Sequence, residues 1–241
     1  MFIVYKLVKK YLLNYKKTLG LWLFKILIMK KLTLTFYFLL VSAFSFAQYG
    51  YRDSNRIGIS AGVNQFTLNT DNFETKPQTG WNAGLSVRGN FYDNWDMVYA
   101  IQFSENNFSV ATDQLVFGKE DVNYKLPSAQ ISLQLSYILI ENHLSFEFGP
   151  LVQVNGKFKV ESGKENNVIS GTTLLAKDIV DISKFNFYPT VGITAGVKHF
   201  RLNVSYQYGI SNMLGSLNSK NPGYNFKGNP GILNGNVILY L

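Results

Sequence analysis

The sequence predicts an all-β fold: an eight-stranded antiparallel up-and-down transmembrane β-barrel with short periplasmic turns and long extracellular loops. Apolar and polar residues alternate with a period of two in eight segments, as in strands with one apolar face. Very short and long connections alternate between these segments, as they do in outer-membrane barrels. A segment near the N-terminus has the parts of a secretory signal peptide.

That N-terminal segment, residues 29–47, begins Met-Lys-Lys, continues as an uncharged apolar run and ends Ser-Phe-Ala, which fits the small-x-small cleavage rule. A transmembrane anchor is the alternative, but the apolar run is shorter than the roughly 20 residues that a spanning helix needs. Residues 1–28 are interpreted as an upstream extension from a start codon assigned too early, with a membrane-surface amphipathic helix as the alternative. The barrel domain is therefore expected at 48–241.

The formal net charge of +8 belongs to the N-terminus, since residues 1–47 hold eight lysines and no acidic residue. The remaining chain has no net charge, which argues against a nucleic-acid partner, because such a protein needs a basic face on its folded domain. The chain has no cysteine. This excludes disulfide scaffolds, zinc sites with thiolate ligands and thiol nucleophiles.

Eight segments carry the strand pattern; in 80–91, Trp81, Leu85 and Val87 share one face and Arg88 lies on the other. The predicted strands are 57–64, 80–91, 95–104, 130–139, 143–154, 187–198, 201–211 and 233–241. Short connections are predicted at 93–94, at 141–142 and around 199–200. Long connections are predicted at 65–79, 106–128, 155–186 and 212–230.

The uncharged row of each strand is expected to face lipid, because lipid can solvate neither a charge nor an unpaired backbone N–H. Aromatic residues near the strand ends are expected to form interfacial girdles. These are Trp81, Phe91, Trp95, Phe146, Phe148, Phe187, Tyr206 and Tyr208. A large soluble barrel with the apolar row inside, as in lipocalins, is the alternative, but it does not explain the loop pattern.

The opposite row is polar and is expected to fill the lumen, because eight strands enclose just enough space for side chains. Its neutral members include Ser60, Asn64, Ser86, Gln102, Gln134, Gln153, Asn203 and Gln207. Arg88, Glu147 and Lys198 lie at similar distances from the short turns and are predicted to form a charged cluster, with Glu147 between two cations. We interpret this cluster as structural, with a gate or a proton path as the alternative.

Four segments resemble the PorT-like outer-membrane β-barrel family: GISAGVN at 58–64, GWNAG at 80–84, LSFEFGP at 144–150 and GITAGV at 192–197. The resemblance spans nearly all of residues 50–241 and implies the barrel fold. The chain departs from the family where it has VYAIQ at 98–102 instead of a Pro-Glu pair. Because the family is named after a protein linked to export of secreted surface proteins, the resemblance allows an accessory role in export.

Catalytic and metal signatures are weak. Ser60 lies in a formal G-x-S-x-G match, but that motif requires a strand–turn–helix context and here it lies inside one strand. His143 and His199 fall in short turns and are expected to be polar turn residues. We therefore expect no enzyme activity, no metal and no cofactor.

The predicted function is a structural or binding role through the extracellular loops, or an accessory role in surface-protein export. Within the loop 155–186, the apolar segments 168–169 and 174–176 are expected to contact a partner. A conduit for small solutes or lipid-like ligands and an outer-membrane lipid-modifying enzyme are the alternatives. The expected protein is monomeric, lies in the bacterial outer membrane, contacts its lipid and has other envelope or secretion proteins as candidate partners.

Overall fold

The structure is a computed structural model that describes residues 55–114, 118–220, 223 and 225–241. The expected upstream extension at 1–28 and signal peptide at 29–47 lie outside the described residues. Among the described residues, no helix has the length and apolar character needed to cross a membrane.

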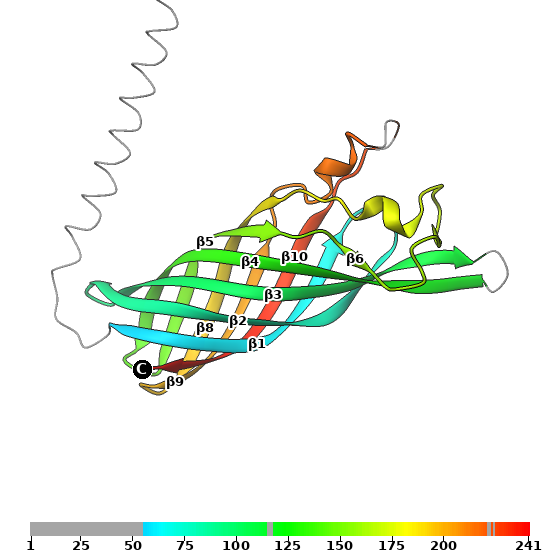
Figure 1. Ribbon diagram of the computed structural model, residues 1–241. Helices are drawn as coiled ribbons and strands as arrows, with labels where there is room; N and C mark the ends of the chain where they lie inside the picture. The colour runs from blue at the N-terminus through cyan, green and yellow to red at the C-terminus, as the bar shows by residue number, and fades with distance from the viewer. Residues whose placement is uncertain (1–54, 115–117, 221–222, 224) are drawn as a thin grey trace, which may run out of the picture. The chain divides into compact units, whose positions relative to one another are not determined.

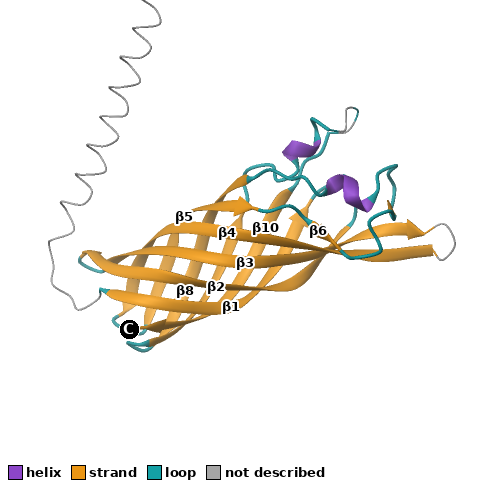
Figure 2. Cartoon of the chain, in the orientation of Figure 1, coloured by secondary structure: helices purple, strands orange, loops and turns teal. Residues whose placement is uncertain are grey.

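Eight long antiparallel strands close into a ring in which every strand is hydrogen-bonded to two neighbours (Figure 1). They are β1 (Arg56–Asn69), β2 (Thr75–Tyr92), β3 (Trp95–Gln114), β4 (Gly118–Ile140), β5 (Leu144–Asn155), β8 (Phe185–Gly196), β9 (Phe200–Tyr208) and β10 (Asn229–Tyr240). The connections contain two short strands, β6 (Lys159–Val160) and β7 (Val168–Ile169), and two 3₁₀ helices, η1 (Ala176–Ile179) and η2 (Gly215–Leu217), visible in Figure 2.

The ring closes between the first and last strands, whose pairing runs from Gly58 opposite Tyr240 to Asn69 opposite Asn229. This continuous register leaves no open edge along the seam, which is the condition for a barrel in lipid. Gly62 allows the close approach there, because a Cβ at this position would lie 2.1 Å from the carbonyl oxygen of Gly235.

The connections β2–β3, β4–β5 and β8–β9 are tight turns at one end of the barrel, here called the short-turn end. Asp93 and Asn142 adopt positive φ angles of 41° and 58°, which Asp and Asn tolerate better than most residues. In the third turn, the amide of Val197 donates to the carbonyl of Phe200 at 2.8 Å. The long connections lie at the opposite, long-loop end (Figure 2).

All eight predicted strands are present, but five of them, β1 to β4 and β10, are longer than the sequence pattern predicted. β3 and β4 together fill most of the segment 106–128, which was predicted to be a loop, and pair from Trp95 opposite Tyr137 to Gln114 opposite Gly118. β1 and β2 likewise extend into the predicted loop 65–79. The reason is a change in the polarity of the two strand faces, described below.

Candidate functional site: a filled lumen and a folded cap

The outward row of the barrel is apolar and exposed, whereas the inward row is polar and buried. On β1, Ile57 and Ile59 are about half exposed, while Ser60 and Asn64 point inward and are buried. Every neutral residue predicted for the lumen follows this pattern: Ser60, Asn64, Ser86, Gln153, Asn203 and Gln207 are buried and Gln102 and Gln134 are half-buried. The expected assignment of the two faces therefore agrees with the structure.

The end of the lumen near the short turns is lined by a ring with one inward side chain from each strand. In ring order these are Arg56, Arg88, Asp96, Ser136, Glu147, Thr194, Arg201 and Tyr240. Arg88 forms a buried ion pair with Glu147 and a second one with Asp96, at 3.2 Å. It also donates to the hydroxyls of Ser136, at 2.8 Å, and Tyr240, at 3.3 Å, so the guanidinium is well satisfied.

The prediction that Arg88, Glu147 and Lys198 form one charged cluster is wrong for Lys198. Lys198 is exposed in the β8–β9 turn, because β8 ends at Gly196, two residues earlier than its predicted end at 198. The lumen instead contains Arg56 and Arg201 as further cations and Asp96 as a second acid. Each lies on the inward row of its strand. A sequence prediction with the correct strand ends and the correct alternation would therefore have placed them in the lumen.

The middle of the lumen is filled by hydrogen-bonded amides. Gln130 donates to Gln153 at 2.7 Å and to Gln207 at 3.3 Å, which joins β4, β5 and β9 across the interior. Asn155 donates to Asn186 at 2.6 Å. A lumen cavity of about 40 Å³ remains, lined by residues such as Ser86, Gln134 and Asn203; it has room for roughly three water molecules.

Toward the long-loop end, both faces of strands β1, β3 and β4 exchange their polarity. On β1 the inward row changes from Asn64 to Phe66, while the outward row changes from Val63 to Gln65. On β3 and β4 the inward row becomes Phe108 and Tyr124, and the outward row becomes polar, with residues such as Glu105 and Lys125.

The residues at which the polarity of the two rows changes are cross-strand neighbours. Asn64 pairs with Gly80, Trp81 with Glu105, and Glu105 with Pro127. On the short-turn side of this line the outward row of the sheet is therefore apolar and the inward row is polar. On the long-loop side the outward row is polar and the inward row is apolar. The second arrangement is that of a water-soluble protein.

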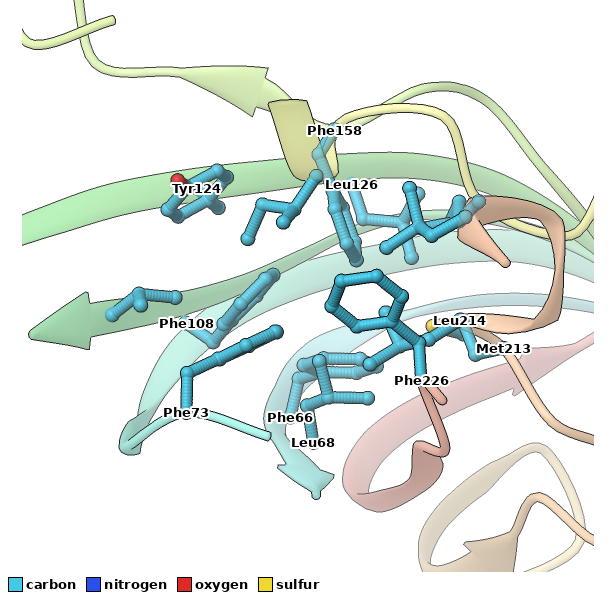
Figure 3. Close-up of a cluster of buried hydrophobic side chains, with 14 of the residues drawn as sticks. Phe66, Leu68, Phe73, Phe108, Tyr124, Leu126, Phe158, Met213, Leu214 and Phe226 are labelled. Carbon is cyan, nitrogen blue, oxygen red and sulfur yellow. The ribbon is translucent and has the colours of Figure 1, made fainter. Parts of the chain in front are cut away.

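Above this line the strand extensions and loops 70–74, 156–184 and 209–228 enclose one apolar core (Figure 3), and we call this part of the molecule the cap. Phe108 stacks on Tyr124 with ring centroids 5.2 Å apart and meets Phe158 edge-on at 4.9 Å. The loops contribute further buried residues: Phe73, Phe158, Ile169, Leu174, Ala176, Ile179, Ile182, Met213, Leu214, Leu217 and Phe226. The core closes the long-loop end of the lumen.

The apolar loop segments that were expected to contact a partner belong to this core instead. Ile169, Leu174 and Ala176 are buried. Tyr124 donates a hydrogen bond to the carbonyl of Ala176 at 2.9 Å, and β7 pairs with β3 through Ile169 opposite Thr112. Among described residues, most exposed side chains of the cap are polar or charged, and Ile210 is an exposed apolar exception.

Charged contacts join the loops to one another. Asp181 pairs with Lys157, at 2.6 Å, and with Lys220, so loops 156–184 and 209–228 are linked. Hydrogen bonds from these two lysines, with their positive charges, lower the pKa of the Asp181 carboxyl to about 2. Lys164 bridges Glu120 and Glu161, each at 2.8 Å, and these hydrogen bonds raise the pKa of its ammonium group.

The predicted aromatic girdle residues all lie on the outward row. Near the short-turn end, Trp95, Phe146 and Phe148 are adjacent, with the Trp95 and Phe148 rings 6.1 Å apart. Trp81 and Phe187 lie closer to the polarity exchange. The other girdle residues, Phe91, Tyr206 and Tyr208, are exposed as well.

No catalytic arrangement is visible around the residues considered for one. Ser60 is inside β1 and faces the lumen. His143 and His199 lie in turns, where their Nδ1 atoms contact the backbone carbonyls of Glu141, at 2.7 Å, and Tyr240, at 3.0 Å. Within the described ranges no group of three metal-ligating side chains is close enough to hold an ion.

Several solved structures are similar to this chain, among them the following three. Neisserial surface protein A is 12% identical with a TM-score of 0.46, covering 76% of this chain and 96% of its own. Ail of Yersinia pestis, in complex with the heparin analogue sucrose octasulfate, is 14% identical with a TM-score of 0.45, covering 77% and 99%. OprG of Pseudomonas aeruginosa is 11% identical with a TM-score of 0.44, covering 78% and 96%. No curated protein matches the chain.

A closed antiparallel ring with an apolar exterior and a polar, filled interior defines an outer-membrane type of β-barrel. The family model for the outer membrane protein beta-barrel domain matches residues 46–215. The chain belongs to this family, and its place is the bacterial outer membrane.

Proposed function

We propose that this protein is a non-enzymatic, monomeric barrel that presents its folded cap to the outside of the cell as a binding surface. The observation that carries the proposal is the cap itself: its loops are built around an apolar core and present mostly polar side chains on the outside. Ordered loops on a rigid scaffold have little conformational entropy to lose on binding, and they are where function usually lies in such folds. The short-turn end then faces the periplasm, as in other barrels of this type.

A conduit for small solutes fits this geometry less well. The lumen contains a ring of ion pairs, a layer of amides and the core of the cap, with a cavity of only about 40 Å³. A route through the lumen needs all three to rearrange. Conductance of the purified protein in planar bilayers tests this alternative, and we expect no single-channel steps.

An accessory role in the export of surface proteins is the more specific form of the proposal. Its support is the resemblance of four segments, such as 58–64 and 144–150, to the PorT-like family. In this form the partners are other envelope or secretion proteins that contact the cap or the barrel rim.

The test compares the secreted and surface proteomes of wild-type cells, of deletion cells, and of deletion cells expressing a cap variant. Lys119→Glu with Lys177→Glu reverses two exposed charges on the cap, and Lys198→Glu at the short-turn end is the matched control. Loss of a set of surface proteins in the deletion and the cap variant, with normal membrane insertion, supports a cap-mediated role in export. An unchanged profile in both removes the export role and leaves a barrel that binds a ligand through its cap.

A further inference from the structure

The ring of side chains near the short-turn end contains more positive than negative charge. Its cations are Arg56, Arg88 and Arg201, and its acids are Asp96 and Glu147; all five side chains are buried. In the low dielectric of a closed barrel, an uncompensated charge is far more costly than on a surface, so the imbalance needs an explanation.

Two of the three guanidinium groups have partners. Arg88 pairs with both acids. Arg56 donates to the carbonyl of Lys198 at 2.6 Å and to the side-chain oxygen of Asn142 at 3.1 Å.

Arg201 differs from both. Its side chain is only 5% exposed, and its Nε makes no hydrogen bond with any described residue. Its guanidinium carbon lies 5.9 Å from the ring centroid of Tyr240, and Arg88 is at the same distance from that ring. A cation–π contact of this kind offsets only part of the cost of removing a guanidinium from water.

Glu147, the acidic residue that faces Arg201, already accepts hydrogen bonds from other residues. One oxygen of Glu147 accepts from Arg88 and from Ser136, and the other accepts from Asn203 at 3.3 Å. Arg88 and Arg56 both lie near enough to repel Arg201 electrostatically. Arg201 is therefore a buried cation that lies near two other cations, and its Nε donor has no partner among the described residues.

We propose that Arg201 binds a small monovalent anion at this end of the lumen, with Arg56 contributing to the positive potential. Arg201 is the second residue of β9 and Arg56 is the first residue of β1, so the site adjoins the short-turn end rather than the sealed cap. This binding site is independent of the proposed role of the cap.

Bromide provides the direct test, because it replaces chloride and scatters anomalously. Crystals of the full barrel soaked in sodium bromide are expected to show an anomalous peak within hydrogen-bonding distance of the Arg201 guanidinium. A wild-type map with bromide only at surface positions, and water or a protein carboxylate on Arg201, overturns the proposal.

Stability in solution provides a second test. At constant ionic strength, replacing gluconate by chloride is expected to stabilise the refolded protein against urea, and chloride at ten times its dissociation constant raises the folding equilibrium constant about 11-fold. Formate tests whether a small carboxylate can take the same place. Arg201→Gln should abolish the chloride effect, and in gluconate it should be at least as stable as the wild type, because it removes an unpaired buried charge.

Lys198→Gln is the matched control, since it removes one positive charge at the same end of the barrel from an exposed side chain. It should keep the full response to chloride. If chloride stabilises Arg201→Gln as much as the wild type, the effect is a general salt effect and the proposed site is wrong. If Arg201→Gln does not fold, the neutral Arg201→Met variant serves in its place.

Discussion

The barrel wall and the cap are made from the same strands, yet they are solvated in opposite ways. On β3, Ile101 faces outward and Ser104 inward in the barrel wall, whereas in the cap Asn107 faces outward and Phe108 inward. The alternation of β3 keeps its phase from Ile101 to Phe108. Only the polarity of the two rows changes, and it changes along one line of cross-strand neighbours.

This difference shows where the protein leaves the lipid. In lipid the apolar row is stable outside and the polar groups must find partners within the lumen. Beyond the lipid, water solvates the outer row and the hydrophobic effect favours an apolar interior. We therefore expect the exchange to mark, on β1 to β4, the boundary of the hydrocarbon layer on the side of the long-loop end.

The largest expected effect comes from breaking the ion pairs in the barrel wall. Glu147→Leu leaves Arg88 with one of its two acids and should cost about 3–5 kcal/mol, because removing one partner leaves a poorly compensated buried charge. The triple variant that adds Arg88→Met and Asp96→Asn should recover most of this loss, because it leaves neither Arg88 nor Asp96 as an unpaired buried charge. Urea unfolding of the protein in lipid vesicles, followed by gel shift, measures both; a single variant as stable as the wild type contradicts the structural role of the pair.

Removing a core residue of the cap should be nearly as costly, but the damage should be confined to the cap. Phe108→Ala deletes a ring that contacts Phe66, Tyr124 and Phe158, and should cost about 3–4 kcal/mol. Ser104→Ala, four residues away on the same row, should cost about 1 kcal/mol through its hydrogen bond to Ser128. Limited proteolysis should cut loop 156–184 in the first variant and spare it in the second.

An arginine scan along the outward row tests the boundary itself. Ile101→Arg places a charge in lipid and should cost about 2–4 kcal/mol, as lipid-facing arginines do near the midplane of barrels. Asn107→Arg, on the same face of the same strand, should cost no more than about 1 kcal/mol, through the loss of the hydrogen bond that Asn107 donates to the carbonyl of Thr79. Equal costs for the two variants in vesicles would falsify the placement of the boundary.

The smallest expected effect concerns the contact that joins two loops of the cap. Because the pKa of Asp181 is lowered from 3.8 to about 2, its carboxylate stabilises the cap fully above about pH 4 and loses this contribution as the pH falls toward 2. Amide hydrogen exchange in loops 156–184 and 209–228 should therefore accelerate between pH 4 and pH 2, beyond the intrinsic change. Asp181→Asn should have faster exchange at neutral pH and a weaker response to acid.

The barrel and the lumen pair were accessible from sequence because a period of two assigns each residue to a face. Arg88 and Glu147 could be brought together from their distances to the short turns, and the structure pairs them. Lys198 was misplaced because a strand end was predicted two residues too late. Arg201 and Asp96 were missed, although each occupies the inward row of its strand.

The cap was missed for a physical reason. Segments 65–79 and 106–128 were predicted to be loops because their outward row is polar, which contradicts a lipid-facing strand. The alternation continues there with Phe66, Phe108 and Tyr124 pointing inward, so a search for the reversed polarity would have extended the strands.

Local alternation, turn residues and the sequence of short and long connections determined by themselves the eight strands and the face that each residue occupies, because these depend on near neighbours in the chain. The tertiary structure alone decided that Arg56, Asp96 and Arg201 join Arg88 and Glu147 in the lumen, and that the loops bury their apolar residues in one core. Those contacts join residues far apart in sequence, such as Arg56 with Asn142 and Tyr124 with Ala176, and they exist only once the ring has closed.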